Sequence, residues 1–101
     1  MNYSGTGRII AEGRKEKGLT QKQLAEKLNI SDRTVSKWEC GKGFPDASML
    51  EPLADVLQIP LADIIRGERG VTSPGEDIRI REIIRILHTT WRTRIFQILK
   101  K

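Results

Sequence analysis

Residues 19–42, LTQKQLAEKLNISDRTVSKWECGK, contain two short helical patterns separated by only three residues. In the first pattern, Thr20 and Gln23 have the spacing of a capping box, in which each side chain bonds the other residue's backbone amide. Asn29 can adopt the left-handed conformation that ends a helix, and Ser31 is a good N-cap for the next one. Because the connection is so short, we expect the two helices to cross at a steep angle.

The second of these helices has little to bury and many polar side chains. Its large apolar residues are Val35 and Trp38, which are three positions apart and therefore share one face. The opposite edge presents polar or small residues, namely Asp32, Arg33, Ser36, Lys37 and Cys40. A helix that is anchored by one edge and projects polar groups from the other fits the major groove of DNA. An ordinary solvated helix face has the same composition, so the pattern alone leaves both interpretations open.

Three further segments before residue 68 have helical patterns: residues 6–17, a segment with the apolar stripe Leu50, Leu53, Ala54 and Leu57, and residues 61–66. Gly18 would end the first of them and Gly67 the last. Asp46 or Ser48 would cap the middle one, with Pro52 near its first turn, where a missing amide costs least. Apolar spacing then predicts a common core, made of Ile10, Leu24, Ala25, Leu28, Val35, Trp38, Leu53, Leu57 and Ile64.

The last quarter of the chain has a different pattern. Residues 67–77, GERGVTSPGED, have the glycine, serine and proline of a linker. Apolar residues then recur at steps of three and four, which predicts one long amphipathic helix with arginines on its other face. We therefore divide the chain into a domain at 1–68, a linker at 69–76 and a helix at 77–101. The residues expected to bury this stripe are Ile80, Ile84, Leu87, Trp91, Ile95 and Ile98.

Three occupants could cover that stripe. The helix could pair with the same helix of a second copy and form a dimer, or it could dock against the domain at 1–68 of its own chain. It could also lie on a membrane surface, as basic amphipathic helices do. We favour dimerisation or docking over a membrane, and a dimer most of all, because large exposed apolar patches usually mark an interface.

Charge and composition limit the classes of function. The chain carries a net charge of +5 with a pI of about 9.7, which fits nucleic acid or an anionic surface. Residues 1–75 hold 11 Lys and Arg against 10 Asp and Glu, and residues 76–101 hold 7 against 3. The single cysteine excludes an internal disulfide and indicates a reducing compartment. With no secretory h-region and no apolar run of about 20 residues, we expect a cytoplasmic, nucleoid-associated protein.

Residues 20–41 fit the pattern TQxxLAxxLxISxxTVSxWExG, which resembles the helix-turn-helix core of the Cro and phage-repressor family, also called the xenobiotic-response-element family of transcriptional regulators. Residues 44–68 resemble the fourth and fifth helices of that family. The resemblance covers about residues 7–68 and does not extend to the last helix. It implies an all-α fold, with a five-helix, lambda-repressor-like helix-turn-helix domain, to which the C-terminal amphipathic helix is added.

The resemblance also implies roles for individual residues. Asp32, Arg33 and Lys37 match base-reading positions, although Asp32 could instead cap its helix or orient Arg33. Thr34 and Ser36 would make lesser contacts. Gln21 matches a family residue that binds a phosphate and braces the second of the two helices, and Lys42 matches a position that contacts the DNA backbone. Arg14 and Glu39 match a buried ion pair, although they could also be two separate surface charges. The helical spacing of Trp38 with other apolar residues places it in the core.

We therefore expect a sequence-specific DNA-binding transcriptional regulator, a repressor that binds a near-palindromic operator in double-stranded DNA as a homodimer. The alternative is a protein-interaction module, such as an antitoxin or adaptor, which the near balance of charge in residues 1–75 keeps open. No nucleophile, base and orienting group can be assembled, so we expect no enzyme activity. His88 and Cys40 do not complete a metal site, and we expect no cofactor and no small-molecule ligand.

Overall fold

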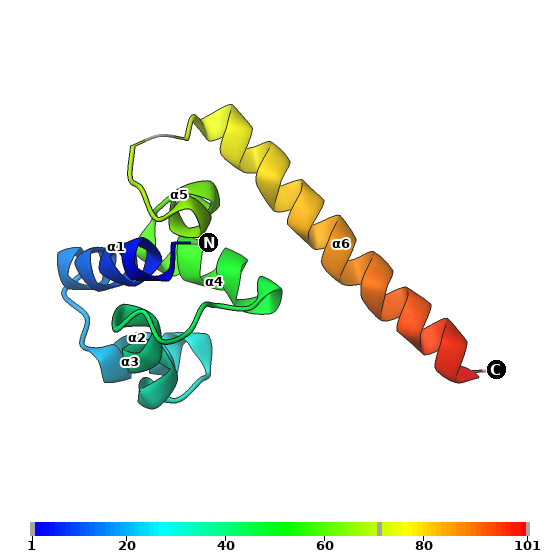
Figure 1. Ribbon diagram of the computed structural model, residues 1–101, viewed down its shortest axis with the longest axis horizontal. Coiled ribbons are helices and arrows are strands. Elements are labelled where there is room, and N and C mark those ends of the chain that lie inside the picture. The colour runs from blue at the N-terminus through cyan, green and yellow to red at the C-terminus, as the bar shows by residue number, and fades with distance from the viewer. Residues whose placement is uncertain (1, 71, 101) are drawn as a thin grey trace.

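The computed structural model describes residues 2–70 and 72–100, with side chains as far as Leu87. Its helices are α1 (Tyr3–Glu16), α2 (Gln21–Leu28), α3 (Asp32–Glu39), α4 (Ala47–Leu57), α5 (Leu61–Arg66) and α6 (Pro74–Lys100). Figure 1 shows α1 to α5 gathered in one body, from which α6 projects as a long rod. No residue in the described ranges lies in a strand, and the all-α fold class predicted from the sequence is confirmed.

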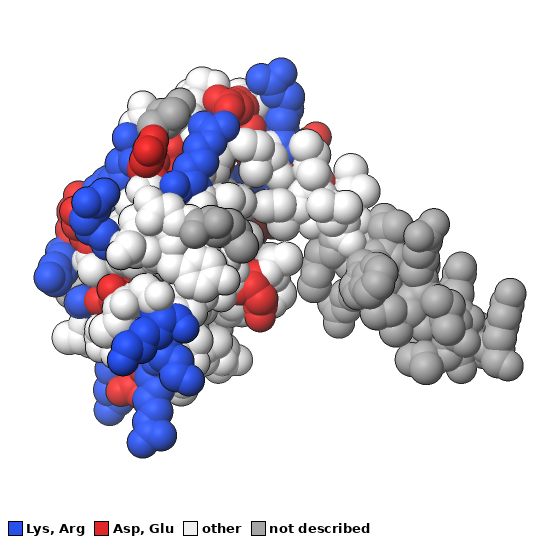
Figure 2. All heavy atoms as spheres, in the orientation of Figure 1, with Lys and Arg blue, Asp and Glu red and all other residues white. Residues whose placement is uncertain are grey.

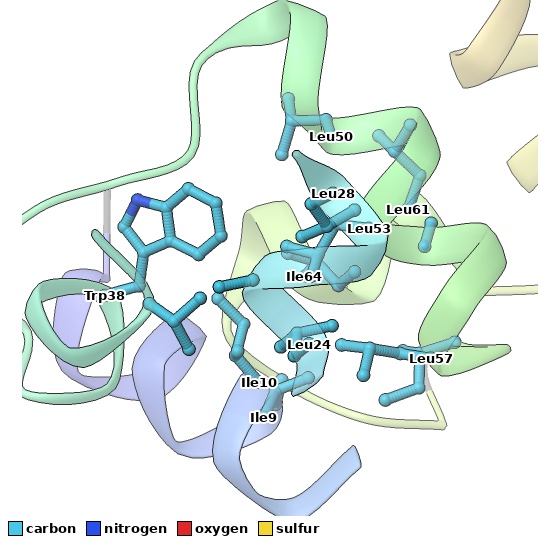
Figure 3. Packing of buried hydrophobic residues seen from close by; sticks show 14 residues of the cluster. Ile9, Ile10, Leu24, Leu28, Trp38, Leu50, Leu53, Leu57, Leu61 and Ile64 are labelled. Atoms are coloured by element: carbon cyan, nitrogen blue, oxygen red, sulfur yellow. The ribbon is translucent and has the colours of Figure 1, made fainter. Parts of the chain in front are cut away.

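The five short helices share one apolar core. All nine residues that the sequence places there are buried, with at most 5% of the surface of each exposed. They converge with Ile9, Leu50 and Leu61 between the helices (Figure 3). Burying an aliphatic side chain of this size stabilises a fold by roughly 1.5–3 kcal/mol, so this cluster is the main source of the domain's stability.

Local signals place the ends of the helices in the helix-turn-helix segment. The capping box of α2 is present, with Gln23 N donating to Thr20 Oγ1 over 3.0 Å and Thr20 N donating to Gln23 Oε1 over 2.9 Å. Asn29 ends α2 with a φ of +60°. Ser31 caps α3 by accepting a hydrogen bond from Thr34 N. These predictions are confirmed, since each depends on residues only a few positions apart.

The first helix begins earlier than the sequence predicts. It starts at Tyr3 rather than at residue 6, because the Asn2 side chain accepts a hydrogen bond from Gly5 N over 2.9 Å and caps it. Glycine normally weakens a helix. Here the packing requires it, since a Cβ atom at Gly7 would overlap the carbonyl oxygen of Trp38. Gly7 therefore lets α1 approach α3 closely.

Of the two caps that the sequence offers for α4, the structure has Asp46, whereas Pro52 lies further into the helix than expected. Asp46 is the N-cap and accepts from Met49 N over 3.1 Å, while the Ser48 hydroxyl donates to the Asp46 carboxylate. Pro52 is the sixth residue of α4 and lies beyond the first turn, so the prediction for it was wrong. Its ring removes an amide that would have bonded the Ser48 carbonyl, which is tolerable because this side of α4 is exposed to water.

The last helix begins at Pro74, within the segment expected to be a linker. Ser73 caps it by accepting from Glu76 N over 3.3 Å, and proline suits the first helical position because it lacks an amide. Ile80 and Ile84 pack, partly buried, against the core. Leu87 is on the same stripe but 65% exposed, because α6 has passed the edge of the domain there (Figure 1). The predicted stripe residues Trp91, Ile95 and Ile98 have side chains outside the described part of the chain.

Candidate DNA interface

A tight turn fixes α3 against α2. Only residues 29–31 separate the two helices, and Ile30 N donates back to the carbonyl oxygen of Ala25 over 3.0 Å. The left-handed Asn29 reverses the chain, and Ser31 starts the new helix at once. With both ends of the turn hydrogen-bonded, α3 has a defined orientation relative to the core.

Two buried side chains anchor α3 along one edge. Val35 is fully buried and Trp38 is 4% exposed. Gly7 of α1 also lies directly against the Trp38 carbonyl oxygen, so α1 packs closely on α3. Burial along this edge orients the rest of α3 toward solvent.

The opposite edge of α3 carries the side chains expected to read bases. Asp32, Arg33 and Lys37 are exposed, whereas Thr34 and Ser36 are half-buried on its flanks. The Thr34 hydroxyl is also hydrogen-bonded to Ser31 Oγ over 3.0 Å. The geometry therefore brings the three main candidates onto one accessible ridge and leaves Thr34 and Ser36 less able to reach a ligand.

Asp32 does not cap α3. Ser31 fills that position, and no hydrogen bond or ion pair of the described residues involves the Asp32 carboxylate. It lies at the first residue of α3, where the helix dipole favours a negative charge. Its side chain is therefore accessible for a contact outside the protein.

Glu39 joins α3 to the two helices before it. Arg14 of α1 donates to its carboxylate through Nε over 2.7 Å and Nη2 over 3.0 Å, and Gln21 Nε2 of α2 donates over 3.1 Å. The Arg14 and Glu39 side chains are only 12% and 8% exposed. The hydrogen bond with Glu39 raises the pKa of Arg14 above its ordinary value. This node holds the C-terminal end of α3 in place, as the resemblance implies.

Gln21 retains one donor for a ligand. Its amide nitrogen carries two hydrogens, of which one is directed to Glu39. It is also the first residue of α2, and a helix N-terminus offers free backbone amides to an anion. Gln21 can therefore brace α3 and contact a phosphate at the same time.

Basic side chains surround this ridge. Figure 2 shows lysine and arginine gathered over the end of the molecule that α2 and α3 form. The exposed cations of this part of the chain are Lys22, Lys27, Arg33, Lys37 and Lys42. Lys42 follows α3, and its backbone amide donates to the Lys37 carbonyl over 2.9 Å. Such a surface attracts a polyanion even though residues 1–75 are nearly neutral as a whole.

Two other kinds of feature are absent from the described residues. They contain no cluster of three or more potential metal ligands. None of their helices is long and apolar enough to cross a membrane.

Sequence reasoning missed one set of contacts, those that hold the start of α6. Asp77 and Arg81 form an ion pair four positions apart, and Arg81 also contacts Asp55 of α4. The spacing of Asp77 and Arg81, with Ser73 and Glu76 at capping-box positions, was a usable signal. Their contact with Asp55 had no signal in the sequence, because 26 positions separate the partners.

Comparison with known proteins places this geometry among transcription factors. A family model described as helix-turn-helix matches residues 10–64. The chain is 39% identical over 56 residues to the HTH-type transcriptional activator BcrR of Enterococcus faecalis, covering 55% of this chain and 28% of that protein. It is 41% identical over 58 residues to the putative multi-protein-binding factor 1 of Yarrowia lipolytica, covering 57% and 38%. The chain thus spans less than half of either relative.

The fold likeness extends beyond the matched segment. A crystal structure of the clp gene regulator ClgR from Corynebacterium glutamicum aligns with a TM-score of 0.59 and 18% identity, and the alignment covers 96% of this chain and 94% of that one. At this identity the likeness concerns the fold alone, and it includes most of α6.

Proposed function

Because the chain belongs to the helix-turn-helix family of DNA-binding transcriptional regulators, we propose that α3 enters the major groove of DNA and reads its sequence. The observation that carries this proposal is the division of α3 into two edges. Val35 and Trp38 are buried on one, and Asp32, Arg33 and Lys37 are exposed on the other. A projecting helix of this kind can present side chains to base edges without disturbing its own core.

The exposed side chains have distinct chemical roles. Arg33 and Lys37 would donate to O6 and N7 of guanine, the commonest specific contact in the major groove. Asp32 would accept from the amino group of cytosine. Thr34 and Ser36 would make lesser contacts, consistent with their partial burial.

Two residues next to this ridge would bind the DNA backbone. Gln21 offers its remaining amide hydrogen and the N-terminus of α2, and Lys42 offers an exposed ammonium after α3. Contacts with phosphate fix the register of the protein on the duplex but carry no sequence information directly. Their loss should therefore weaken binding to all sequences.

We propose further that two copies pair through α6. Beyond Ile84 the predicted stripe continues along a helix that has left the domain, and Leu87 on that stripe is 65% exposed. A two-fold dimer would present two α3 helices to one face of DNA. Its target would be a near-palindrome with half-site centres about one helical turn, roughly 34 Å, apart.

A charged residue on the stripe tests the pairing. Leu87→Glu should raise the dimer dissociation constant at least about tenfold, which corresponds to roughly 1.4 kcal/mol, because the carboxylate would be desolvated between the two α6 helices. Leu87 is exposed in one copy, so the domain itself should keep its melting temperature. Sedimentation at micromolar concentration measures the effect. Ile86→Glu is the matched control, since Ile86 is 63% exposed and lies about 100° around α6 from Leu87. A wild-type chain that is monomeric, or a Leu87→Glu variant that dimerises as tightly as the wild type, would contradict pairing through α6.

Selection from random duplex DNA tests the function as a whole. We expect repeated rounds of binding and sequencing to enrich a near-palindrome whose two arms are contacted by α3. A reporter promoter that carries the enriched sequence then shows the sign of regulation, and we propose repression, in which the bound dimer covers the promoter. Higher transcription would assign activation instead, the role that the name of the Enterococcus faecalis relative gives.

A protein-interaction module is the second candidate. The charge of residues 1–75 is nearly balanced, and the name of the Yarrowia lipolytica relative refers to binding of proteins. This candidate predicts no enriched sequence in the selection and only weak, salt-sensitive binding to any duplex. A DNA-binding regulator of transcription, by contrast, would be found with the nucleoid.

A further inference from the structure

An ion pair within α6, between Arg81 and Asp77, connects this helix to two helices of the domain. Arg81 Nε donates to Asp77 Oδ2 over 2.9 Å, and Arg81 Nη1 donates to Asp55 Oδ1 of α4 over 2.6 Å. The other Asp77 oxygen accepts from Ala62 N over 3.4 Å, at the N-terminus of α5, where Pro60 provides no side-chain cap. The three helices α4, α5 and α6 therefore meet at this ion pair.

The segment before α6 is also fixed. Asp63 of α5 is 2% exposed, and its carboxylate accepts from Gly70 N over 2.9 Å and from Thr72 N over 3.2 Å. Arg66 Nη2 donates to Glu76 Oε1 over 2.8 Å. These contacts hold both the approach to α6 and its first turn, so the helix leaves the domain in one direction.

These polar contacts define geometry more than they add stability. The Arg81 and Asp77 side chains are 19% and 13% exposed, so the pair is partly shielded from water. Shielded ion pairs often contribute little net stability, because desolvation offsets their attraction, but their hydrogen bonds are directional. Ile80 and Ile84 supply the apolar contact of α6 with the core, which constrains its angle less than a directional bond does. Arg85 also pairs with Glu51 of α4, but its side chain is 62% exposed, and exposed pairs constrain a helix less than the shielded contact of Arg81.

We infer that Arg81 is a positioning residue that sets the distance between the two half-sites of the operator. The inference rests on the proposed function, since it requires two copies joined through α6. In such a dimer, the angle between α6 and its domain determines where each α3 lies. Across the 31 Å width of the molecule, a tilt of about 10° would displace α3 by about 5 Å, which exceeds one base-pair step of about 3.4 Å.

The test compares binding to duplexes in which two copies of the selected half-site are separated by spacers that differ by one base pair. A spacing that prevents the two domains of a dimer from binding both half-sites at once should lower the affinity about 10²–10⁴-fold. The wild-type chain should therefore prefer one spacing over its neighbours at least about tenfold. Arg81→Gln should keep its dimer and its affinity for a single half-site, while its preference falls to about threefold or less.

Arg79→Gln is the matched control, since it makes the same charge change at an exposed position two residues away. It should keep the wild-type spacing preference. If Arg81→Gln fails to fold, Asp55→Ala removes the other partner of the same contact at an exposed position and should also flatten the preference.

A spacing preference that stays as sharp in Arg81→Gln or Asp55→Ala as in the wild type would overturn the inference, even if DNA is bound with sequence preference. A wild-type chain that binds no duplex selectively would instead overturn the proposed function, and the inference with it.

Discussion

Replacing Trp38 by alanine is expected to lower the free energy of unfolding by about 3–5 kcal/mol, the usual cost of truncating a buried aromatic residue. The side chain is 4% exposed and packs at the end of the core, where α1 and α3 meet (Figure 3). Small domains are stable by only about 5–15 kcal/mol, so a large part of the total would be lost.

The effect should extend to the orientation of α3. Trp38 and Val35 are the two residues that bury its inner edge. With one of them removed, the hydrogen bonds that Glu39 accepts from Arg14 and Gln21 would have to hold the end of the helix against α1 and α2. We therefore expect Trp38→Ala to lose DNA affinity even at temperatures where it is folded.

Denaturant unfolding followed by circular dichroism measures the stability. Trp38→Phe is the control, since it keeps an aromatic ring in the same space and should cost clearly less than alanine. An unchanged unfolding midpoint in Trp38→Ala would contradict the burial of Trp38 on the inner edge of α3.

The features that sequence alone predicted are those that depend on near neighbours. The capping box of α2, the left-handed Asn29 and the Ser31 cap each involve residues within three or four positions. The edges of α3 follow from helical periodicity, because Val35 and Trp38 can share a face only if Arg33 and Lys37 point elsewhere. This part of the candidate site could therefore be predicted from the order of the residues.

Contacts between distant segments could not be predicted in the same way. The need for glycine at position 7 arises from the carbonyl of Trp38, 31 positions later. The carboxylate of Asp77 caps a helix that begins 16 residues earlier, at Leu61. Periodicity identified the apolar stripe of α6, but only the arrangement of helices divides it into a docked part at Ile80 and Ile84 and an exposed part at Leu87.

Replacing Arg33 by alanine is expected to cost about 1–3 kcal/mol of binding free energy for each half-site and to relax the base preference at one position. The reason is the loss of a bidentate bond with guanine, which neither water nor alanine can replace. In a dimer both half-sites lose this bond, so the total effect on the operator would be about twice as large. Arg33 is exposed and outside the core, so the variant should melt like the wild type.

Lys42→Ala provides the contrast. A lysine bound to phosphate carries no base information, so its removal should weaken binding to every sequence about equally. It should also reduce the slope of log affinity against log salt by about one for each phosphate that is no longer neutralised. The two substitutions each remove one positive charge, so a difference between them reports on role rather than on net charge.

The most direct test of base reading by α3 is the base-preference profile of the wild-type, Arg33→Ala and Lys42→Ala chains, measured on all single-base variants of the selected operator at several salt concentrations. Base reading by α3 predicts that Arg33→Ala loses discrimination at one symmetric pair of positions, while Lys42→Ala keeps the whole profile at lower affinity. Equal loss of affinity in both variants, with neither profile changed, would contradict it.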